Sequence, residues 1–244
     1  MSNIVSNLEI IQDRIKNTCL KIGRNPLEVQ LLLATKTVPA DRIRVALETG
    51  LTLVGENKIQ ELKTKHADLV DLGTRFHFIG HLQTNKIKEV LRYADCIESV
   101  DRNDLVQKLD QRLRYEERKI DVLLQVNTSY EESKFGVDPQ QILEFAKEVS
   151  KYDTLRVKGL MTIGLLSSES EKVRECFQLL KTIQEQIKEL NLPNFEMKEL
   201  SMGMSNDFEI AIEEGATIVR VGTSIFGDRI YPDSYYWNEN VTIT

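Results

Sequence analysis

The chain has 244 residues, of which 41% are hydrophobic and 29% are charged, a composition typical of soluble globular proteins. Its formal net charge of −6 argues against a nucleic-acid-binding surface, which needs a basic excess. The sequence contains no apolar stretch long enough to predict a membrane span, and its first residues show no signal-peptide pattern. The three widely spaced cysteines predict free thiols in a reducing cytoplasm and no metal site.

Apolar residues recur at helical spacing from Ile4 to Cys19, which predicts an N-terminal helix over about residues 3–22. Eight short apolar runs follow, as expected for strands that are buried on both faces of a parallel sheet. In chain order the runs are Val29–Lys36, Leu51–Asn57, Arg75–Gly80, Cys96–Val100, Ile120–Thr128, Val157–Gly164, Met197–Met204 and Thr217–Gly222. Segments with helical periodicity lie between them, among them Pro39–Thr49, Asp104–Arg118 and Glu171–Leu190.

Strands that alternate with helices in this way are typical of a closed barrel or a doubly wound sheet. Eight such units in a chain of this length favour a single α/β domain with a (β/α)8 TIM-barrel fold. We therefore expect one domain over residues 1–244, with the barrel at about residues 25–228. The C-terminal tail, at about residues 229–244, is expected to be partly docked and then frayed.

In such barrels the active face is where the strands end, and the first run ends at Lys36. Five apolar or small residues precede this lysine, so we expect its stem to be buried and its amine to point into a cavity. Burial disfavours the charged ammonium form, and an uncharged amine is the form that condenses with an aldehyde. A lysine at a strand end can also extend to water, and position alone leaves both interpretations open.

The ends of the last two runs predict a site for an anion. Gly222 lets the backbone approach a ligand, and together with Thr223 it can offer N–H groups and a hydroxyl where barrels often bind phosphate. Ser205, at the end of the seventh run, is placed to cap a helix over Asp207–Glu214 and to add a second hydroxyl. A tight turn at Gly222 and simple helix capping by Ser205 are the alternative explanations.

In a closed barrel the eighth strand lies beside the first, so an aldehyde that carries a phosphate could bridge Lys36 and the Gly222 loop. Pyridoxal 5′-phosphate (PLP) is such a molecule. Arg220 is expected in the same layer, and an arginine can only donate a hydrogen bond. A pyridine nitrogen that faced Arg220 would stay unprotonated, which would make the ring a weaker electron sink.

Three further polar residues at or near the strand ends have less specific interpretations. Glu56 could act as a general base or could pair with a lysine. His77 lies inside an apolar run and is interpreted as a core histidine with a hydrogen-bond partner, and His81 is interpreted as structural.

Seven motifs, met in order along the chain, match one known family. They are Ala34–Thr37, Gly55–Glu61, His77–Lys86, Ser133–Gly136, Gly159–Ile163, Leu200–Ser205 and Val219–Thr223. Together they resemble the PLP-homeostasis protein family, which is similar to the N-terminal barrel of alanine racemases. The resemblance runs from about residue 4 to residue 228, and the residues after Gly227 match no pattern of the family.

The resemblance implies that Lys36 carries PLP as an internal aldimine and that Arg220 faces the pyridine nitrogen. The other residues that it implies in cofactor binding are Asn57, Ser205, Gly222 and Thr223, with Ser201, Met202 and Lys134 as weaker correspondences. It also implies a cytoplasmic protein of PLP homeostasis that could hand the cofactor to apo-enzymes, with no robust turnover, no catalytic residues and no metal.

An alanine racemase adds a β-rich domain that supplies a second acid–base tyrosine, and we expect no such domain here. Ile163 also stands where a racemase would place a histidine against the ring. An open barrel mouth fits a monomer. The alternative functions are a slow PLP-dependent amino-acid racemase and an aldolase that would use Lys36 directly on a sugar-phosphate aldehyde.

Overall fold

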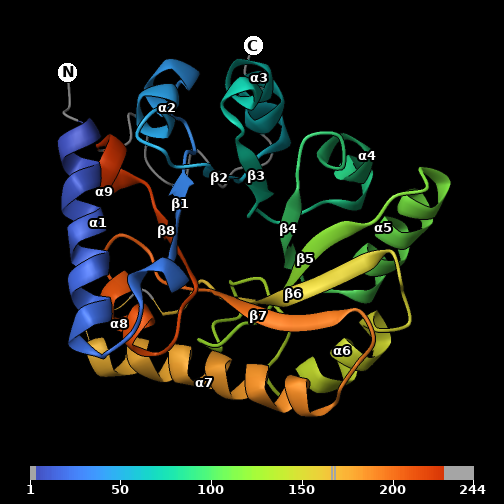
Figure 1. Cartoon of the computed structure of the whole chain (residues 1–244). Coiled ribbons are helices and arrows are strands. Elements are labelled where there is room, and N and C mark those ends of the chain that lie inside the picture. The colour runs from blue at the N-terminus through green and yellow to red at the C-terminus, as the bar shows by residue number, and fades with distance from the viewer. Residues whose placement is uncertain (1–3, 166, 168, 228–244) are drawn as a thin grey trace.

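The computed structural model describes residues 4–165, 167 and 169–227. Within these residues, eight parallel strands close into a barrel in the order in which they occur along the chain, and helices surround it (Figure 1). The strands are β1 (Gln30–Ala34), β2 (Leu53–Glu56), β3 (Arg75–Phe78), β4 (Cys96–Val100), β5 (Ile120–Gln125), β6 (Leu155–Met161), β7 (Phe195–Ser201) and β8 (Ile218–Val221). The predicted (β/α)8 barrel is confirmed.

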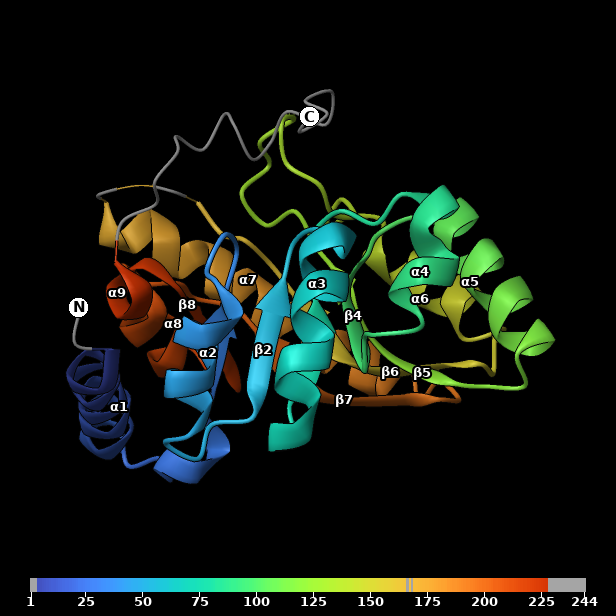
Figure 2. The ribbon, with the colours of Figure 1, turned by 90° about the horizontal axis from the view of Figure 1, so that it is seen from above.

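The helices from α2 to α8 occupy the connections between the strands, whereas α1 precedes β1 and α9 follows β8. Helices α2 and α3 pack against each other, and β2 is seen between them in Figure 2. The α-helices are α1 (Ile4–Lys21), α2 (Ala40–Leu47), α3 (Ile59–Leu69), α4 (Ile87–Val90), α5 (Asn103–Tyr115), α6 (Ile142–Val149), α7 (Ser170–Glu189), α8 (Phe208–Glu213) and α9 (Thr223–Phe226). Three short 3-10 helices are also present, namely η1 (Pro26–Glu28), η2 (Val70–Leu72) and η3 (Thr84–Lys86). No helix within the described ranges is long and apolar enough to cross a membrane.

Alternate residues of each strand face the helices or the barrel lumen. The side that faces the helices belongs to one large core, to which Leu33 and Val54 contribute. Two smaller clusters fill the lumen, one made of Leu32, Leu53 and Ile218 and the other of Cys96, Leu123 and Met161. Burial on both faces explains why the strands appear in the sequence as continuous apolar runs.

The predicted N-terminal helix is α1, which buries the stripe Ile4, Leu8, Ile11, Ile15 and Cys19. It packs against α8 and α9 (Figure 1). Arg14 forms an ion pair with Glu209 of α8 at 2.9 Å, and Asn7 donates to the backbone carbonyl of Ile225 in α9 at 3.0 Å. The helix therefore supports the elements that flank the end of β8. The predicted C-terminal tail lies outside the described residues.

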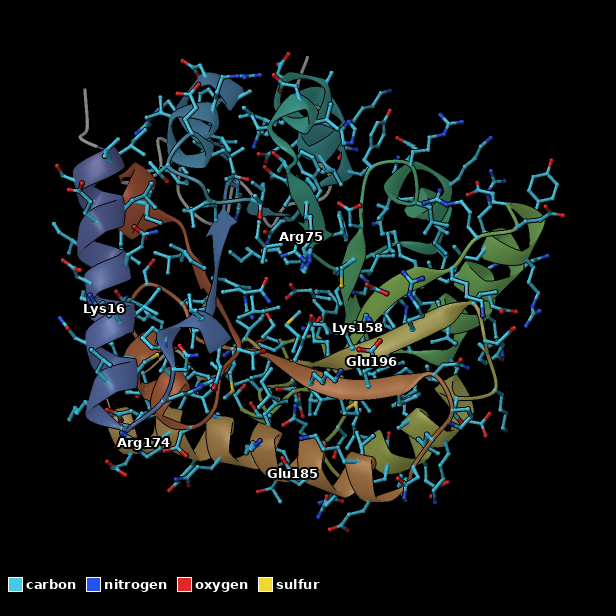
Figure 3. The ribbon with its side chains drawn as sticks, in the orientation of Figure 1. Lys16, Arg75, Lys158, Arg174, Glu185 and Glu196 are labelled. Atoms are coloured by element: carbon cyan, nitrogen blue, oxygen red, sulfur yellow. The ribbon has the colours of Figure 1, made fainter. Side chains whose placement is uncertain are left out.

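Charged side chains lie at the end of the barrel where the strands begin. In Figure 3, Lys158 of β6 and Glu196 of β7 lie together, and Arg75 of β3 is labelled apart from this pair. Lys158 and Glu196 form an ion pair, and Arg75 donates to Gln30 at 2.7 Å. The polar residues predicted to bind a ligand lie at the other end, where the strands finish.

Candidate functional site

Lys36 lies two residues beyond the end of β1, and only 8% of it is exposed. Leu32 belongs to a cluster in the lumen and Ala34 packs against it, so the alternation of the strand places Lys36 on the lumen side as well. Thr37 follows with a φ of 64°, which a β-branched residue rarely adopts. This turn ends the strand and leaves the lysine at the mouth of the barrel.

On the side of β1 that faces the helices, buried charged residues bind the end of the strand. Thr35 Oγ1 donates to Glu56 Oε1 at 2.5 Å, and Lys65 of α3 donates to that same oxygen at 2.6 Å. Burial raises the pKa of Glu56 to about 7, and the charge of Lys65 opposes the rise. Glu56 therefore pairs with a lysine and lies outside the lumen, which leaves its predicted alternative role as a general base without support.

Glu61 of α3 completes this arrangement. It accepts from Lys65 at 2.8 Å and from the backbone N–H of Thr37 at 2.6 Å. Lys65 also donates to the backbone carbonyl of Thr35 at 2.8 Å. Glu61 and Lys65 of α3 thus bind the backbone on both sides of Lys36. We call these two residues, together with Glu56 of β2, the α3 clamp. The clamp accounts for the stability of the unusual turn at Thr37.

The predicted anion site lies beside the end of β1. β8 pairs with β1, and a Cβ atom added to Gly222 would lie 2.6 Å from the backbone oxygen of Ala34. Glycine is therefore required for the close approach of the two strand ends. Thr223 Oγ1 lies 3.4 Å from Ser205 Oγ, so the two predicted hydroxyls meet next to Gly222. The first turn of α9 begins at Thr223, and the first N–H groups of a helix have no partner within it.

The predicted helix cap at Ser205 is wrong. α8 begins at Phe208, and the residue before it is Asp207. Asp207 Oδ1 instead accepts from the backbone N–H of Met204 at 2.5 Å, and Asp207 N–H donates to the carbonyl of Met204 at 3.1 Å. This turn separates Ser205 from the helix and keeps its hydroxyl near Thr223.

Arg220 of β8 is 5% exposed and is fixed by two hydrogen bonds inside the lumen. Its Nη1 donates to Ser201 Oγ of β7 at 2.8 Å, and its Nη2 donates to the backbone oxygen of Thr162, just after β6, at 2.7 Å. Burial lowers the pKa of Arg220, and the charges of Glu98 and Asp207 oppose this effect. Arg220 and Lys36 therefore lie on neighbouring strands and on the same side of the sheet, as predicted.

A chain of hydrogen bonds continues from Ser201 across the lumen. Ser201 Oγ donates to Glu98 Oε2 of β4 at 2.6 Å, and the other oxygen of Glu98 lies 2.6 Å from His77 Nδ1 of β3. Burial alone would raise the pKa of Glu98, but the hydrogen bond and charge of His77, with the charge of Arg220, bring the pKa below its ordinary value. Glu98 is therefore an ionised acceptor, and His77 has the partner predicted for a core histidine.

The remaining predicted residues differ in their placement. Asn57 is half-buried and directly follows β2. Met202 belongs to the large core between strands and helices. Lys134 donates to the backbone carbonyl of Gly164 at 2.7 Å, so it joins the loops that follow β5 and β6. Ile163 packs against the luminal cluster of Cys96 and its neighbours, where it supplies an apolar wall.

The sequence analysis missed Glu98 and the members of the α3 clamp other than Glu56. A signal for Glu98 was present, because a charged residue inside the otherwise apolar run Cys96–Val100 implies a buried partner. Lys65 carried no such signal, since a lysine on a helix is usually exposed.

The donor set fits PLP. An amine stands at one strand end, two hydroxyls and a helix start at another, and a buried guanidinium lies in the lumen on the second of these strands. These groups suit an aldehyde, a phosphate and a pyridine nitrogen respectively. Among the residues that the structure describes, no group of three or more potential metal ligands is present.

Comparison with known proteins identifies the family. The family model described as alanine racemase, N-terminal domain, matches residues 6–230. The pyridoxal phosphate homeostasis protein of Aquifex aeolicus (strain VF5) is 40% identical over 230 residues, which cover 94% of this chain and 100% of the relative. The chain belongs to the pyridoxal phosphate homeostasis protein family. The relative is named for homeostasis and not for an enzymatic activity.

Solved structures agree with this assignment. The structure of PipY from Synechococcus elongatus PCC7942, with PLP bound, is 33% identical and has a TM-score of 0.78, covering 89% of this chain and 100% of PipY. The alanine racemase of Clostridium difficile 630 is 14% identical, with a TM-score of 0.72 that covers 96% of this chain and 58% of the racemase. The second similarity shows that this family member shares the barrel fold of the racemase.

Proposed function

We propose that this protein binds PLP at the mouth of its barrel, holds it as an imine on Lys36, and serves intracellular PLP homeostasis. The observation that carries the proposal is the close approach of the end of β1 to Gly222. It brings a buried lysine beside a group of anion-binding donors, as one small phosphorylated aldehyde requires. The PLP-bound structure of PipY and the name of the Aquifex relative support the same cofactor.

In this proposal the whole chain forms one PLP-binding domain over residues 1–244. Ser205, Gly222 and Thr223 hold the phosphate, because two hydroxyls and the N–H groups at the start of α9 can all donate to it. Arg220 donates to the pyridine nitrogen, and Ser201 orients Arg220. Asn57 lines the face of the ring.

We further propose that turnover is low. PLP supplies an electron sink when its ring nitrogen is protonated, and a guanidinium that can only donate keeps this nitrogen unprotonated. Ile163 offers no proton where an acid–base group would be needed. The protein would then act in the cytoplasm as a monomer that buffers PLP and passes it to apo-enzymes.

The absorbance spectrum of the purified protein with PLP tests the proposal. We expect a band at about 420 nm, typical of an imine of this cofactor. Borohydride reduction followed by peptide mass mapping should locate the label on Lys36. The variant Lys36→Ala should lose the band and keep its circular dichroism, whereas the control Lys172→Ala, at an exposed residue of α7, should keep both. A colourless protein that takes up no PLP, or a label on another lysine, would refute the proposal.

Two measurements separate carrier from enzyme. Mixing the loaded protein with an apo PLP enzyme should restore activity faster than the same concentration of free PLP does. Chiral chromatography after incubation with L-alanine should show racemisation well below about 1 per second, the lower range of ordinary enzyme rates. Faster turnover would favour the racemase alternative. Light scattering should give the mass of one chain.

A further inference from the structure

The hydrogen bonds of the polar chain across the lumen converge on Glu98. A carboxylate can only accept hydrogen bonds, so Ser201 must donate to Glu98 and its oxygen is left to accept from Arg220, 2.8 Å away. The same rule places a proton on His77 Nδ1, 2.6 Å from the other oxygen of Glu98. All the donors of this hydrogen-bonded series therefore point toward Glu98. Its carboxylate is the final acceptor for Ser201 on one side and for His77 on the other.

The burial of these groups makes their pairing necessary. Glu98 and Ser201 are completely buried, and Arg220 and His77 are 5% exposed. A buried charge is strongly destabilising unless an opposite charge and hydrogen bonds compensate it. Of the two carboxylates that act on Arg220, Glu98 has the stronger effect and Asp207 the weaker. The charge of Arg220 is thus balanced by a residue on β4, on the other side of the lumen.

The hydrogen bonds also fix the plane of the guanidinium. Arg220 is anchored at Nη1 by the hydroxyl of Ser201 and at Nη2 by the carbonyl of Thr162. The carbonyl belongs to the backbone, but the orientation of the hydroxyl depends on Glu98. Without that acceptor the Ser201 hydroxyl is free to rotate and the anchor at Nη1 is weakened.

We infer that Glu98 is a positioning residue for the cofactor ring, which holds Arg220 in its donor orientation through Ser201 and balances its charge. The inference rests on the proposed function, because it assumes that Arg220 faces a bound ring. It assigns a role to a residue that touches neither the ring nor the phosphate and that lies on a strand with no other member of the site. His77 supports Glu98 by donating a hydrogen bond to its other carboxylate oxygen.

A thermodynamic cycle tests the inference. The PLP dissociation constant is measured by absorbance for the unchanged protein, for Glu98→Gln, for Arg220→Gln and for the double variant. We expect Glu98→Gln to weaken binding about tenfold, the range of a hydrogen bond to a charged group. The double variant should bind no more weakly than Arg220→Gln alone, because Glu98 acts only through Arg220. Losses that multiply in the double variant would overturn the inference.

A spectroscopic readout separates positioning from general destabilisation. With PLP labelled with 15N in the ring, the nitrogen resonance reports the hydrogen bond from Arg220. It should shift in Glu98→Gln and return toward its original position in Glu98→Asp, which keeps the charge. The matched control is Asp110→Asn, because Asp110 is also buried and paired with an arginine, Arg114, but lies outside the lumen on α5. It should lose stability without changing PLP affinity or the resonance.

Should Glu98→Gln fail to fold, Ser201→Ala breaks the same chain without removing a charge. It is expected to weaken PLP binding and to shift the resonance in the same direction. Failure of the unchanged protein to bind PLP would refute the proposed function itself. Normal binding by the unchanged protein, together with unaltered affinity and resonance in Glu98→Gln or Ser201→Ala, would refute only the role of Glu98.

Discussion

The ammonium group of Lys65 donates to the backbone carbonyl of Thr35 at 2.8 Å, so a helix residue holds the strand end that carries the candidate cofactor lysine. The same ammonium group contacts Glu56 at 2.6 Å and Glu61 at 2.8 Å. Since Lys65 is 7% exposed and Glu56 is completely buried, this ion pair is shielded from solvent. The α3 clamp therefore couples the stability of the barrel to the geometry at Lys36.

Replacing Lys65 by methionine should be costly, because it removes the buried donor that bonds Glu56, Glu61 and the carbonyl of Thr35 and leaves Glu56 to take up a proton. We expect Lys65→Met to lower the free energy of unfolding by about 3 kcal/mol in urea titrations near neutral pH. The turn at Thr37 should also loosen, which would weaken PLP binding. The control is Lys147→Met on α6, whose partner Glu144 is exposed; it should change stability by less than about 0.5 kcal/mol. Equal effects of the two variants would contradict the role of the clamp.

Glu56 should make stability depend on pH in a defined direction. Burial raises its pKa from 4.5 to about 7 in the folded protein, so the folded state holds a proton that the unfolded chain has already released in this window. The free energy of unfolding should therefore fall as the pH rises from about 5 to about 8, by about 2 to 3 kcal/mol from this group. The glutamine of Glu56→Gln cannot titrate. The free energy of unfolding of the unchanged protein should therefore fall relative to that of Glu56→Gln as the pH rises. A difference that stays constant over the range would exclude this ionisation as the cause.

The sequence predicts the barrel well because its physical cause is local. A strand that is buried on both faces needs consecutive apolar residues, and this pattern is visible in runs such as Val29–Lys36 without knowledge of any partner. Lys36 and Arg220 were predicted as site residues for a related reason, since strand ends of a barrel meet at one face. The approach of Gly222 to the first strand follows from the closure of the barrel.

The rest depends on contacts that no local pattern contains. Ser201 and Glu98 are 103 positions apart, and which strand residues meet across a lumen is set by the register of the whole barrel. The burial of Lys65 likewise follows from the packing of α3 against two strand ends. The error at Ser205 has a local cause, because a turn closed by Asp207 delays the start of α8.

Gly222 should tolerate no side chain. An added Cβ would lie 2.6 Å from the oxygen and 3.4 Å from the Cβ of Ala34, and a backbone oxygen cannot rotate away. We expect Gly222→Ala to lower the free energy of unfolding by about 1 to 3 kcal/mol and to reduce PLP affinity, because the two strand ends must separate. The comparison is Gly73→Ala, where nothing lies within 4 Å but φ is 69°. That variant should lose stability through backbone strain alone and bind PLP normally. Unchanged PLP affinity in Gly222→Ala would show that the approach of the two strands is not needed for the site.

The hydroxyls of Ser205 and Thr223 should distinguish PLP from pyridoxal. Their oxygens lie 3.4 Å apart beside Gly222, where they can both donate to one phosphate. The double variant Ser205→Ala with Thr223→Val removes both donors and keeps the β-branched shape of Thr223. We expect it to bind PLP about tenfold more weakly or worse, since each charge-assisted hydrogen bond contributes roughly 1.5 to 3 kcal/mol.

Binding of pyridoxal, which has the aldehyde and the ring but no phosphate, should be unaffected by the same double variant. Equilibrium dialysis with each ligand measures the two dissociation constants. Thr182→Val provides the control, because Thr182 is an exposed residue of α7 whose hydroxyl bonds only its own helix. Because Lys36 is unchanged, both ligands retain access to the same amine, so a selective loss of PLP affinity locates the phosphate at these two hydroxyls. An equal loss for PLP and pyridoxal would instead mean that the double variant had disturbed the strand ends.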